Sequence, residues 1–304
     1  MDQQSLKRLT RELQQKAEGK VTKNLQLSKI TTYKVGGSCD LHLMAESTDD
    51  VRLAIENCKK EKIPFFIIGK GSNVLAADEG FKGLIIQLGS EFKNIRESGG
   101  NIFCGSSVPL SKLLSVVLRY SLKGLSFASG IPGSVGGAVA GNAGAYGSHI
   151  CDYVSHATVF TGKGLDSYEG DIIKKSGYRK GFLKEGDVLL EVVFTLEKGK
   201  HAEIDKEMKK YSSDRKKKHP QKEASCGSVF KNPPKISAAS LIENAGWKGK
   251  TLGGAAVSKR HSNFIINKGS SSASDIYHLI KLIQSDVYYK SGVKLEPEVK
   301  FLGF

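Results

Sequence analysis

The sequence predicts an α+β protein of about two domains. Its 304 residues are enough for two hydrophobic cores at the usual domain size of roughly 150 residues. Segments with a helical period and short apolar strands follow one another without the regular strand–helix alternation of a doubly wound sheet. A hydrophobic content of 39% with 25% charged residues is that of an ordinary globular protein and excludes a disordered chain.

Helices in the first half of the chain are predicted from apolar spacing and from their end signals. Leucines give residues 5–18 a helical period, and Gly19 ends that helix. A second helix begins near Thr48, whose hydroxyl can cap it, and Pro109 opens a third helix that reaches about residue 121. The strands are the short apolar runs over residues 41–43, 65–68, 84–88, 102–104, 154–161 and 188–196.

The second half opens with a charged helix over residues 201–218, which we interpret as the join between two domains. A short helix over residues 237–244 follows and ends at Gly246. The last helix begins at a capping box, Ser272-x-x-Asp275, and stops at Gly292. Strands are predicted over residues 255–257, 264–266 and 299–302.

Composition argues against several classes of protein. The first twenty residues are charged throughout, unlike a signal peptide, and no apolar run approaches the ~18 residues that span a bilayer. We therefore expect a cytoplasmic protein without membrane insertion. The five cysteines lie far apart with no C-x-x-C pair, which predicts neither a disulfide framework nor a metal site.

The formal net charge of +15 predicts an anionic partner. Nucleic acid, a phosphorylated cofactor and a nucleotide sugar would all satisfy that charge. The basic residues are densest over residues 200–222, where interspersed acids are typical of a solvated helix face. That segment contains Tyr211 as its only aromatic residue, too few for a base-stacking platform, so we expect no nucleic-acid partner.

Two glycine-rich loops are candidates for binding a phosphorylated ligand, since the P-loop and the Rossmann fingerprint are both absent from the sequence. The first is Gly69-Lys70-Gly71-Ser72-Asn73, where backbone N–H groups could approach a phosphate closely. The second covers residues 129–147, which are too apolar for a linker and too rich in glycine for a stable helix. Taken alone, each is also compatible with an ordinary structural turn.

These loops, together with residues 31–37, resemble the FAD-binding half of the UDP-N-acetylenolpyruvoylglucosamine reductase family. The resemblance runs in family order from Thr31 to the C-terminus. Its further motifs are residues 177–179, 226–233, 245–249, 253–258, 261–267 and 295–299.

The resemblance implies a fold of the vanillyl-alcohol-oxidase (PCMH) type. After an N-terminal helical segment, residues 1–29, residues 30–199 would form a two-part FAD-binding domain, and residues 200–304 an α+β substrate-binding domain. The short stretch between Arg179 and Ser228 resembles the subtype that lacks a substrate-clamping tyrosine loop. Non-covalent FAD and NADPH would serve to reduce a UDP-sugar, UDP-N-acetylglucosamine enolpyruvate, to UDP-N-acetylmuramate in peptidoglycan precursor synthesis. We expect a monomer.

The resemblance also implies roles for individual residues. Arg179 would bind the substrate carboxylate, Glu298 would share a proton with it, and Ser228 would protonate the substrate carbon. Lys218, Lys231 and Asn232 would bind the rest of the substrate, although His219 stands where the family more usually has an uncharged residue such as glutamine. The implied FAD-binding positions are Gly69, Lys70, Gly71, Ser72, Asn73, Gly130, Pro132, Gly133, Gly136, Gly137, Asn142, Gly144 and Ala145.

One alternative is a flavin-dependent sugar or alcohol oxidase of the same fold. Such enzymes often tether FAD to a histidine, and His149 and His156 lie beyond the glycine cluster, in no suitable position. Cys226, two residues before Ser228, is not required by the reductase chemistry, and we interpret it as a buried bystander.

Overall fold

The computed structural model describes residues 3–304, so the first two residues of the predicted segment 1–29 lie outside the described part. The chain divides into two compact units, and neither is continuous in sequence. The first unit consists of three segments, which end at Lys23, Lys70 and Asp214. The second unit consists of residues 24–39, 71–82 and 215–304. This division describes packing alone. The functional boundaries 1–29, 30–199 and 200–304 stay a prediction.

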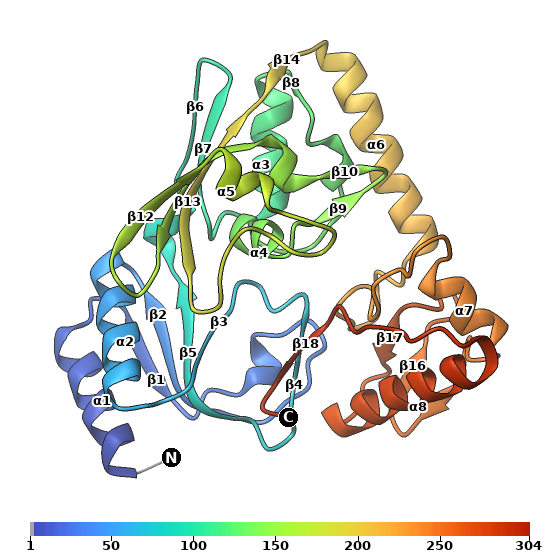
Figure 1. The fold of residues 1–304 in the computed structure, drawn as a ribbon, viewed down its shortest axis with the longest axis horizontal. Coiled ribbons are helices and arrows are strands. Elements are labelled where there is room, and N and C mark those ends of the chain that lie inside the picture. The colour runs from blue at the N-terminus through green and yellow to red at the C-terminus, as the bar shows by residue number, and fades with distance from the viewer. Residues whose placement is uncertain (1–2) are drawn as a thin grey trace. The chain divides into compact units, whose positions relative to one another are not determined.

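One part of the first unit is a four-stranded sheet with two helices against it (Figure 1). Leu9 and Leu13 of the first helix and Ile55 of the second are fully buried in a core that also holds Leu41 and Leu84 of the sheet. The helices are α1 (Gln3–Lys16) and α2 (Thr48–Lys60), and the strands, in sheet order, are β1 (Lys20–Lys23), β2 (Cys39–Ala45), β5 (Phe81–Leu88) and β3 (Phe65–Ile67).

The predicted cap of α2 is wrong by one residue. Ser47, not Thr48, precedes the helix, and its hydroxyl accepts a hydrogen bond from the Asp50 N–H at 3.1 Å. Asp50 is itself buried, and its carboxylate accepts the N–H groups of Glu18 and Gly19 at 2.8 Å each. The carboxylate therefore fixes the chain between α1 and β1 to the start of α2.

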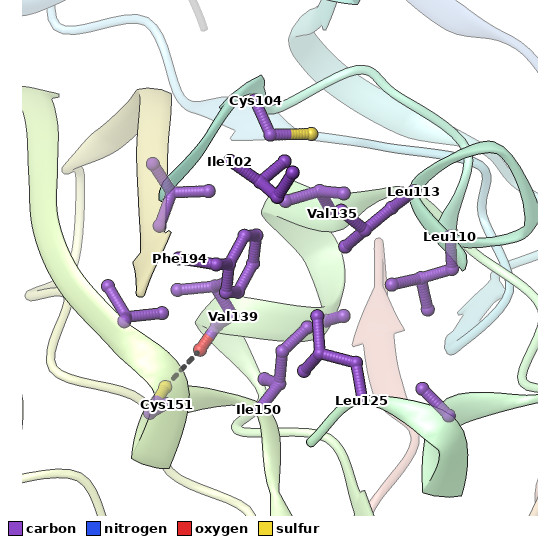
Figure 2. Close-up of a cluster of buried hydrophobic side chains, with 14 of the residues drawn as sticks. Ile102, Cys104, Leu110, Leu113, Leu125, Val135, Val139, Ile150, Cys151 and Phe194 are labelled. Carbon is purple, nitrogen blue, oxygen red and sulfur yellow. Dashed lines mark hydrogen bonds between the residues drawn. The ribbon is translucent and has the colours of Figure 1, made fainter. Parts of the chain in front are cut away.

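The other part of the first unit is an antiparallel five-stranded sheet. Figure 2 shows its core, in which Phe194 of the sheet packs with Val135 and Val139 of a short helix and Leu113 of a longer one. The strands, in sheet order, are β12 (Leu165–Glu169), β11 (Val154–Phe160), β13 (Val188–Thr195), β7 (Asn101–Gly105) and β6 (Ile95–Ser98), and the helices are α3 (Leu110–Arg119) and α4 (Val135–Ala140).

The prediction that residues 129–147 contain no stable helix is wrong, because α4 lies within them. Ser134 caps this helix by accepting the Gly137 N–H at 3.3 Å. Val135 and Val139 are fully buried. Tertiary burial of these two valines offsets the low helix propensity of the glycines.

Short elements complete the chain up to residue 218. The short strands form two antiparallel pairs, β8 (Leu122–Lys123) with β14 (Glu197–Lys198) and β9 (Gly144–Ala145) with β10 (Ser148–His149). The 3₁₀ turns are η1 (Leu27–Lys29), η2 (Ser90–Lys93), η3 (Ser126–Ala128) and η4 (Ile150–Tyr153). The remaining helices are α5 (Asp171–Lys174) and α6 (His201–Lys218), whose last four residues belong to the second unit.

The second unit combines a small antiparallel sheet, two helices and a parallel strand pair. The last helix begins with the predicted capping box of Ser272 and Asp275 and ends at Gly292, which has the left-handed φ of 70°. The elements are β15 (Thr251–Leu252), β16 (Ala255–Val257), β17 (Ile265–Asn267), α7 (Ala238–Asn244), α8 (Ala273–Ser291) and the pair β4 (Val74–Ala76) with β18 (Lys300–Leu302).

Within residues 3–304, no helix is long and apolar enough to cross a lipid bilayer. Over the same range, no group of three or more His, Cys, Asp or Glu side chains is arranged to hold a metal ion.

Candidate active site

In the first unit, the structure brings together the start of the first predicted cofactor loop, Gly69 and Lys70, and the second loop. A Cβ atom on Gly69 would lie 2.6 Å from the Ser134 hydroxyl oxygen, so the start of the first loop contacts the cap of α4. Gly136 also packs closely, because its Cβ would lie 2.8 Å from the Cβ of Ser106. Gly137 differs: it is exposed, and its Cβ would meet only the Ser134 oxygen, at an ordinary 3.5 Å. Gly137 therefore leaves an open face where a side chain would fit without disturbing the protein.

Gly133 and the first turn of α4 are held against the segment 106–110 by backbone hydrogen bonds. The Leu110 N–H donates to the Gly133 carbonyl at 3.1 Å, and the Gly136 N–H donates to the Ser106 carbonyl at 2.7 Å. Gly133 has a φ of 139°, which a residue with a side chain rarely adopts. Pro132 and Gly130 lie exposed beside it. This arrangement gives a fixed, exposed backbone of small residues.

The loop Gly69–Asn73 is anchored through its carbonyl groups. The Gln87 side-chain amide donates to the Gly69 carbonyl at 2.8 Å, and the Thr32 N–H donates to the Gly71 carbonyl at 3.1 Å. Since C=O and N–H point opposite ways across a trans peptide, the N–H groups of Lys70 and Ser72 are directed away from these anchors. Backbone N–H groups presented in this way suit an anionic ligand.

The local backbone geometry requires glycine at position 71. Its φ is +60°, and a Cβ atom would lie 2.1 Å from the Ile30 carbonyl oxygen. A side chain at this position would clash with the protein's own backbone. A substitution at Gly71 would therefore disturb the second unit directly, and it cannot serve as a clean probe of ligand binding.

The donor set of these loops fits FAD. A dinucleotide with a planar ring and a diphosphate needs backbone that can be approached closely, N–H donors for phosphate and positive charge. Gly69, Lys70, Gly130, Pro132 and Gly137 are all exposed, and the Lys70 side chain adds a cation. Small residues and directed N–H groups occur together, as such a ligand requires.

In the second unit, the structure brings together Ser228, Glu298 and Asn73. The Glu298 N–H donates to the carbonyl of Val229, next to Ser228, at 2.7 Å. The Asn73 side-chain amide donates to the Glu298 carbonyl at 3.1 Å. The Thr32 hydroxyl donates to the Ser225 carbonyl at 2.7 Å. Ser228 and Glu298 are both half-buried and so remain accessible to a ligand.

Asn263 fixes the backbone beside Ser228. Its side-chain oxygen accepts the Phe230 N–H at 2.9 Å, its side-chain NH₂ donates to the Phe230 carbonyl at 2.8 Å, and its backbone carbonyl accepts the Val229 N–H at 2.8 Å. Asn263 is buried. Three bonds from one residue give the segment after Ser228 a single defined position.

The predicted substrate-binding residues lie on the same unit. The Lys231 ammonium pairs with the Glu296 carboxylate at 2.5 Å, and the Lys231 N–H donates to the Glu296 carbonyl at 2.9 Å. The Asn232 side-chain oxygen accepts the Ala238 N–H at 3.0 Å, at the start of α7. Lys218 is exposed at the last position of α6.

A cluster of two histidines and a phenylalanine follows Lys218, and sequence reasoning did not predict it. The His219 ring lies 5.3 Å from the His261 ring and 4.8 Å from that of Phe264. Burial, then the nearby charges of His261, Arg215 and Lys218, lower the pKa of His219 to about 4. Burial likewise lowers the pKa of His261, against the opposing effect of Glu243. The only sequence signal was the unusual residue at position 219.

Cys226 is buried in the second unit against Tyr33. Burial raises the pKa of the Cys226 thiol to about 12. The thiol is therefore protonated at neutral pH and is not an activated nucleophile.

Arg179 belongs to the first unit, with the glycine-rich segment, whereas Ser228 and Glu298 belong to the second. Its φ is +56°, a left-handed conformation that a residue with a side chain adopts at a cost of about 1 kcal/mol or more. One terminal nitrogen of its guanidinium, Nη1, donates to the Gly144 carbonyl at 3.1 Å. The guanidinium also lies 5.0 Å from the Tyr178 ring centre.

Comparison with known proteins gives two domain matches and many similar full-length sequences. Residues 40–165 match an FAD binding domain, and residues 219–302 match the UDP-N-acetylenolpyruvoylglucosamine reductase, C-terminal domain. The UDP-N-acetylenolpyruvoylglucosamine reductase of Caldanaerobacter subterraneus is 40% identical over 94% of this chain and 95% of its own. The chain belongs to this reductase family. Reductase 1 of Bacillus cereus is 36% identical over 98% of this chain and 100% of its own.

Solved structures agree with the family assignment. The UDP-N-acetylenolpyruvylglucosamine reductase of Thermus caldophilus matches 93% of this chain and 99% of its own, with a TM-score of 0.82 and 31% identity. The glucose dehydrogenase Phl p 4.0202 matches 66% of this chain and 45% of its own at 12% identity, with a TM-score of 0.51, which shows a shared fold alone. The predicted α+β class and the FAD-binding fold of the vanillyl-alcohol-oxidase type with a separate C-terminal domain are thereby confirmed.

Proposed function

We propose that this protein catalyses the NADPH-dependent reduction of UDP-N-acetylglucosamine enolpyruvate to UDP-N-acetylmuramate, using non-covalent FAD. The observation that carries the proposal is the backbone contact of Glu298 with Val229, the neighbour of Ser228, in the second unit of a reductase-family chain. The Glu298 N–H donates to the Val229 carbonyl at 2.7 Å. The backbone segments that carry the predicted catalytic residues Ser228 and Glu298 therefore lie next to each other.

The FAD-binding residues of this proposal are the exposed small residues of the two glycine-rich loops. FAD held there would supply hydride transfer from NADPH to the terminal vinyl carbon of the substrate. The chain would supply the N–H group of Lys70, which is directed away from the anchored Gly69 carbonyl. Gly137 would supply an open backbone face for the cofactor.

Ser228 is the proposed proton donor. Hydride addition leaves an electron-rich carbon next to the carboxylate, and that carbon is basic enough to take a proton from a hydroxyl group. Ser228 follows Gly227, whose φ of 83° forms the turn, and Asn263 holds the residues after it. The hydroxyl is therefore presented from a rigid backbone, as a general acid requires.

Glu298 and Arg179 are the proposed groups for the negative charge that develops on the substrate carboxylate. Arg179 provides a permanently charged, planar donor. Glu298 stabilises the same charge when it carries a proton, because an ionised glutamate would repel the carboxylate. Donors fixed in advance at the place where charge develops are the usual main source of such stabilisation.

The proposed diphosphate site uses Lys218, Lys231 and Asn232. Lys231 is paired with Glu296, whose side chain is 70% exposed. An exposed ion pair is worth at most about 1 kcal/mol, so an arriving phosphate can replace the glutamate. With this nucleotide-sugar substrate, the proposed reaction belongs to peptidoglycan precursor synthesis. We expect the enzyme to be cytoplasmic and to act as a monomer.

The product of the reaction tests this proposal. Purified enzyme is incubated with NADPH and UDP-N-acetylglucosamine enolpyruvate, and the sugar nucleotide is identified by mass spectrometry and proton NMR. We expect one NADPH consumed for each product formed, with the vinyl signals replaced by those of a lactyl ether. Unchanged substrate, together with oxygen uptake in the presence of simple sugars or alcohols, would instead support an oxidase of the same fold.

A further inference from the structure

The turn that carries Arg179 is docked on the end of the glycine-rich segment. Residues 177–181 face residues 140–144 within the first unit, and three hydrogen bonds connect them at alternate positions. In order along the segment these are Gly181 N–H to the Ala140 carbonyl at 3.1 Å, the Asn142 side-chain NH₂ to the Gly177 carbonyl at 2.9 Å, and Arg179 Nη1 to the Gly144 carbonyl at 3.1 Å.

Asn142 is the central contact, and its surroundings fix the direction of its amide. Its side-chain oxygen accepts the Cys151 N–H at 3.1 Å, while its NH₂ donates to the Gly177 carbonyl. A flipped amide would place an oxygen against the Gly177 carbonyl and an NH₂ against the Cys151 N–H, losing both bonds. Cys151 is held in turn by its thiol, which donates to the Val139 carbonyl at 3.5 Å (Figure 2).

Asn142 is 3% exposed, so its side chain faces the protein. The turn it holds is short and closed, with the Gly177 N–H donating to the Lys180 carbonyl at 2.7 Å. Arg179 has its left-handed φ of +56° inside that turn. A strained conformation of this kind persists only where neighbouring contacts hold it.

We propose that Asn142 is a positioning residue for Arg179, and that its buried side chain acts in this way instead of contacting FAD. Its amide holds the turn at Gly177, and the position of that turn sets where the Arg179 guanidinium lies relative to the glycine-rich segment. The inference rests on the proposed binding of the substrate carboxylate by Arg179. It predicts that loss of the Asn142 NH₂ acts on the enzyme through Arg179.

The variant Asn142→Asp tests this inference, because it keeps the size of the side chain and the acceptor for Cys151 but removes the donor to Gly177. FAD content is measured first. Anaerobic rapid mixing then gives the rate of flavin reduction by NADPH and the rate of reoxidation by UDP-N-acetylglucosamine enolpyruvate. We expect FAD content and NADPH reduction near those of the wild-type protein, with reoxidation slowed by about 10- to 100-fold, the usual effect of a misplaced catalytic group.

A double-mutant cycle separates positioning from a general structural effect. Arg179→Ala alone is expected to slow reoxidation by about 10²–10³-fold, as for the loss of one fixed donor. Adding Asn142→Asp to Arg179→Ala should then slow it no further, because the residue through which Asn142 acts is gone. The matched control is Asn57→Asp, which removes a similar side-chain bond to the Leu53 carbonyl on α2 and should leave both rates unchanged.

Gly181→Ala provides a second variant if Asn142→Asp does not fold. The new Cβ atom would lie 2.2 Å from the Val139 carbonyl oxygen, so the same turn is displaced without any change at Asn142. Reoxidation should again slow while FAD is retained.

Four outcomes would overturn the inference. Two concern Asn142→Asp, which would lose FAD or would be reoxidised at the wild-type rate. The third is a double variant in which the slowing of reoxidation equals the product of the two single effects. The fourth is reoxidation at the wild-type rate in Gly181→Ala. Wild-type reoxidation in Arg179→Ala would overturn the proposed role of Arg179 itself, and the inference with it. A slow Arg179→Ala beside a wild-type-like Asn142→Asp would overturn the inference alone.

Discussion

The variant Gly137→Ala should stabilise the protein without ligand and weaken its binding of FAD. Gly137 lies in the first turn of α4, and an added Cβ would meet only the Ser134 hydroxyl oxygen, at 3.5 Å. Replacing glycine by alanine within a helix contributes about 0.5–1 kcal/mol. The melting temperature of the apoprotein should therefore rise by about 1–3 °C.

The same methyl group would occupy the open face that we propose FAD approaches. Forcing an extra methyl group into a tight contact costs about 1–3 kcal/mol, so the dissociation constant for FAD should rise by about 5- to 150-fold. Gly141→Ala is the matched control. It lies at the other end of α4, its Cβ would meet the Gly137 carbonyl at the same 3.5 Å, and it is not a predicted cofactor position.

Calorimetry of the apoprotein and fluorescence titration with FAD give the two quantities. Opposite changes in stability and affinity, confined to Gly137→Ala, are the expected result. If Gly137→Ala binds FAD as tightly as the wild-type protein and Gly141→Ala do, α4 does not face the cofactor and the reasoning is refuted.

Two further predictions concern the flavin and the histidine cluster. Acid precipitation should release all of the flavin into the supernatant, and flavin retained in the pellet would indicate a covalent tether and favour the oxidase alternative. Because the pKa of His219 is about 4 in the folded protein and near 6.5 when exposed, the unfolded chain binds a proton first as the pH falls from 6.5 to 4, and stability drops. His219→Gln should raise the free energy of unfolding by about 1–2 kcal/mol at pH 4 and leave it unchanged at pH 8. This magnitude is smaller than the pKa difference alone would give, because solvent screens a partly exposed ring. Equal unfolding curves for both proteins at pH 4 would contradict the prediction.

Helices with clear end signals were predictable from the sequence. The helix over residues 201–218 and the capping box at Ser272 have the predicted positions. α4 was not predictable, because four glycines fall within residues 133–141 and the burial of Val135 and Val139 that stabilises it comes from distant strands. Local propensity describes only what a segment prefers when it is alone.

Local sequence patterns also could not predict which segments of the chain make up each unit. β4 pairs with β18, whose residues lie more than 200 positions further along the chain, and Thr32 contacts both Gly71 and Ser225. Contacts over such separations leave no periodic signal in either segment. The motifs of the site were visible in the sequence, whereas the pairing of Ser228 with Glu298 through Val229 required the structure.

The most direct test of the proposed chemistry is the comparison of both half-reactions in the wild-type protein and in Ser228→Ala under anaerobic rapid mixing. If Ser228 donates the proton to the substrate carbon, the variant should bind FAD and lose flavin absorbance with NADPH at nearly the wild-type rate. Its reoxidation by UDP-N-acetylglucosamine enolpyruvate should fall by about 10²–10⁴-fold, the usual contribution of a positioned general acid. Reoxidation at the wild-type rate would contradict this role for Ser228, and loss of NADPH reduction would mean that Ser228 supports the flavin site instead.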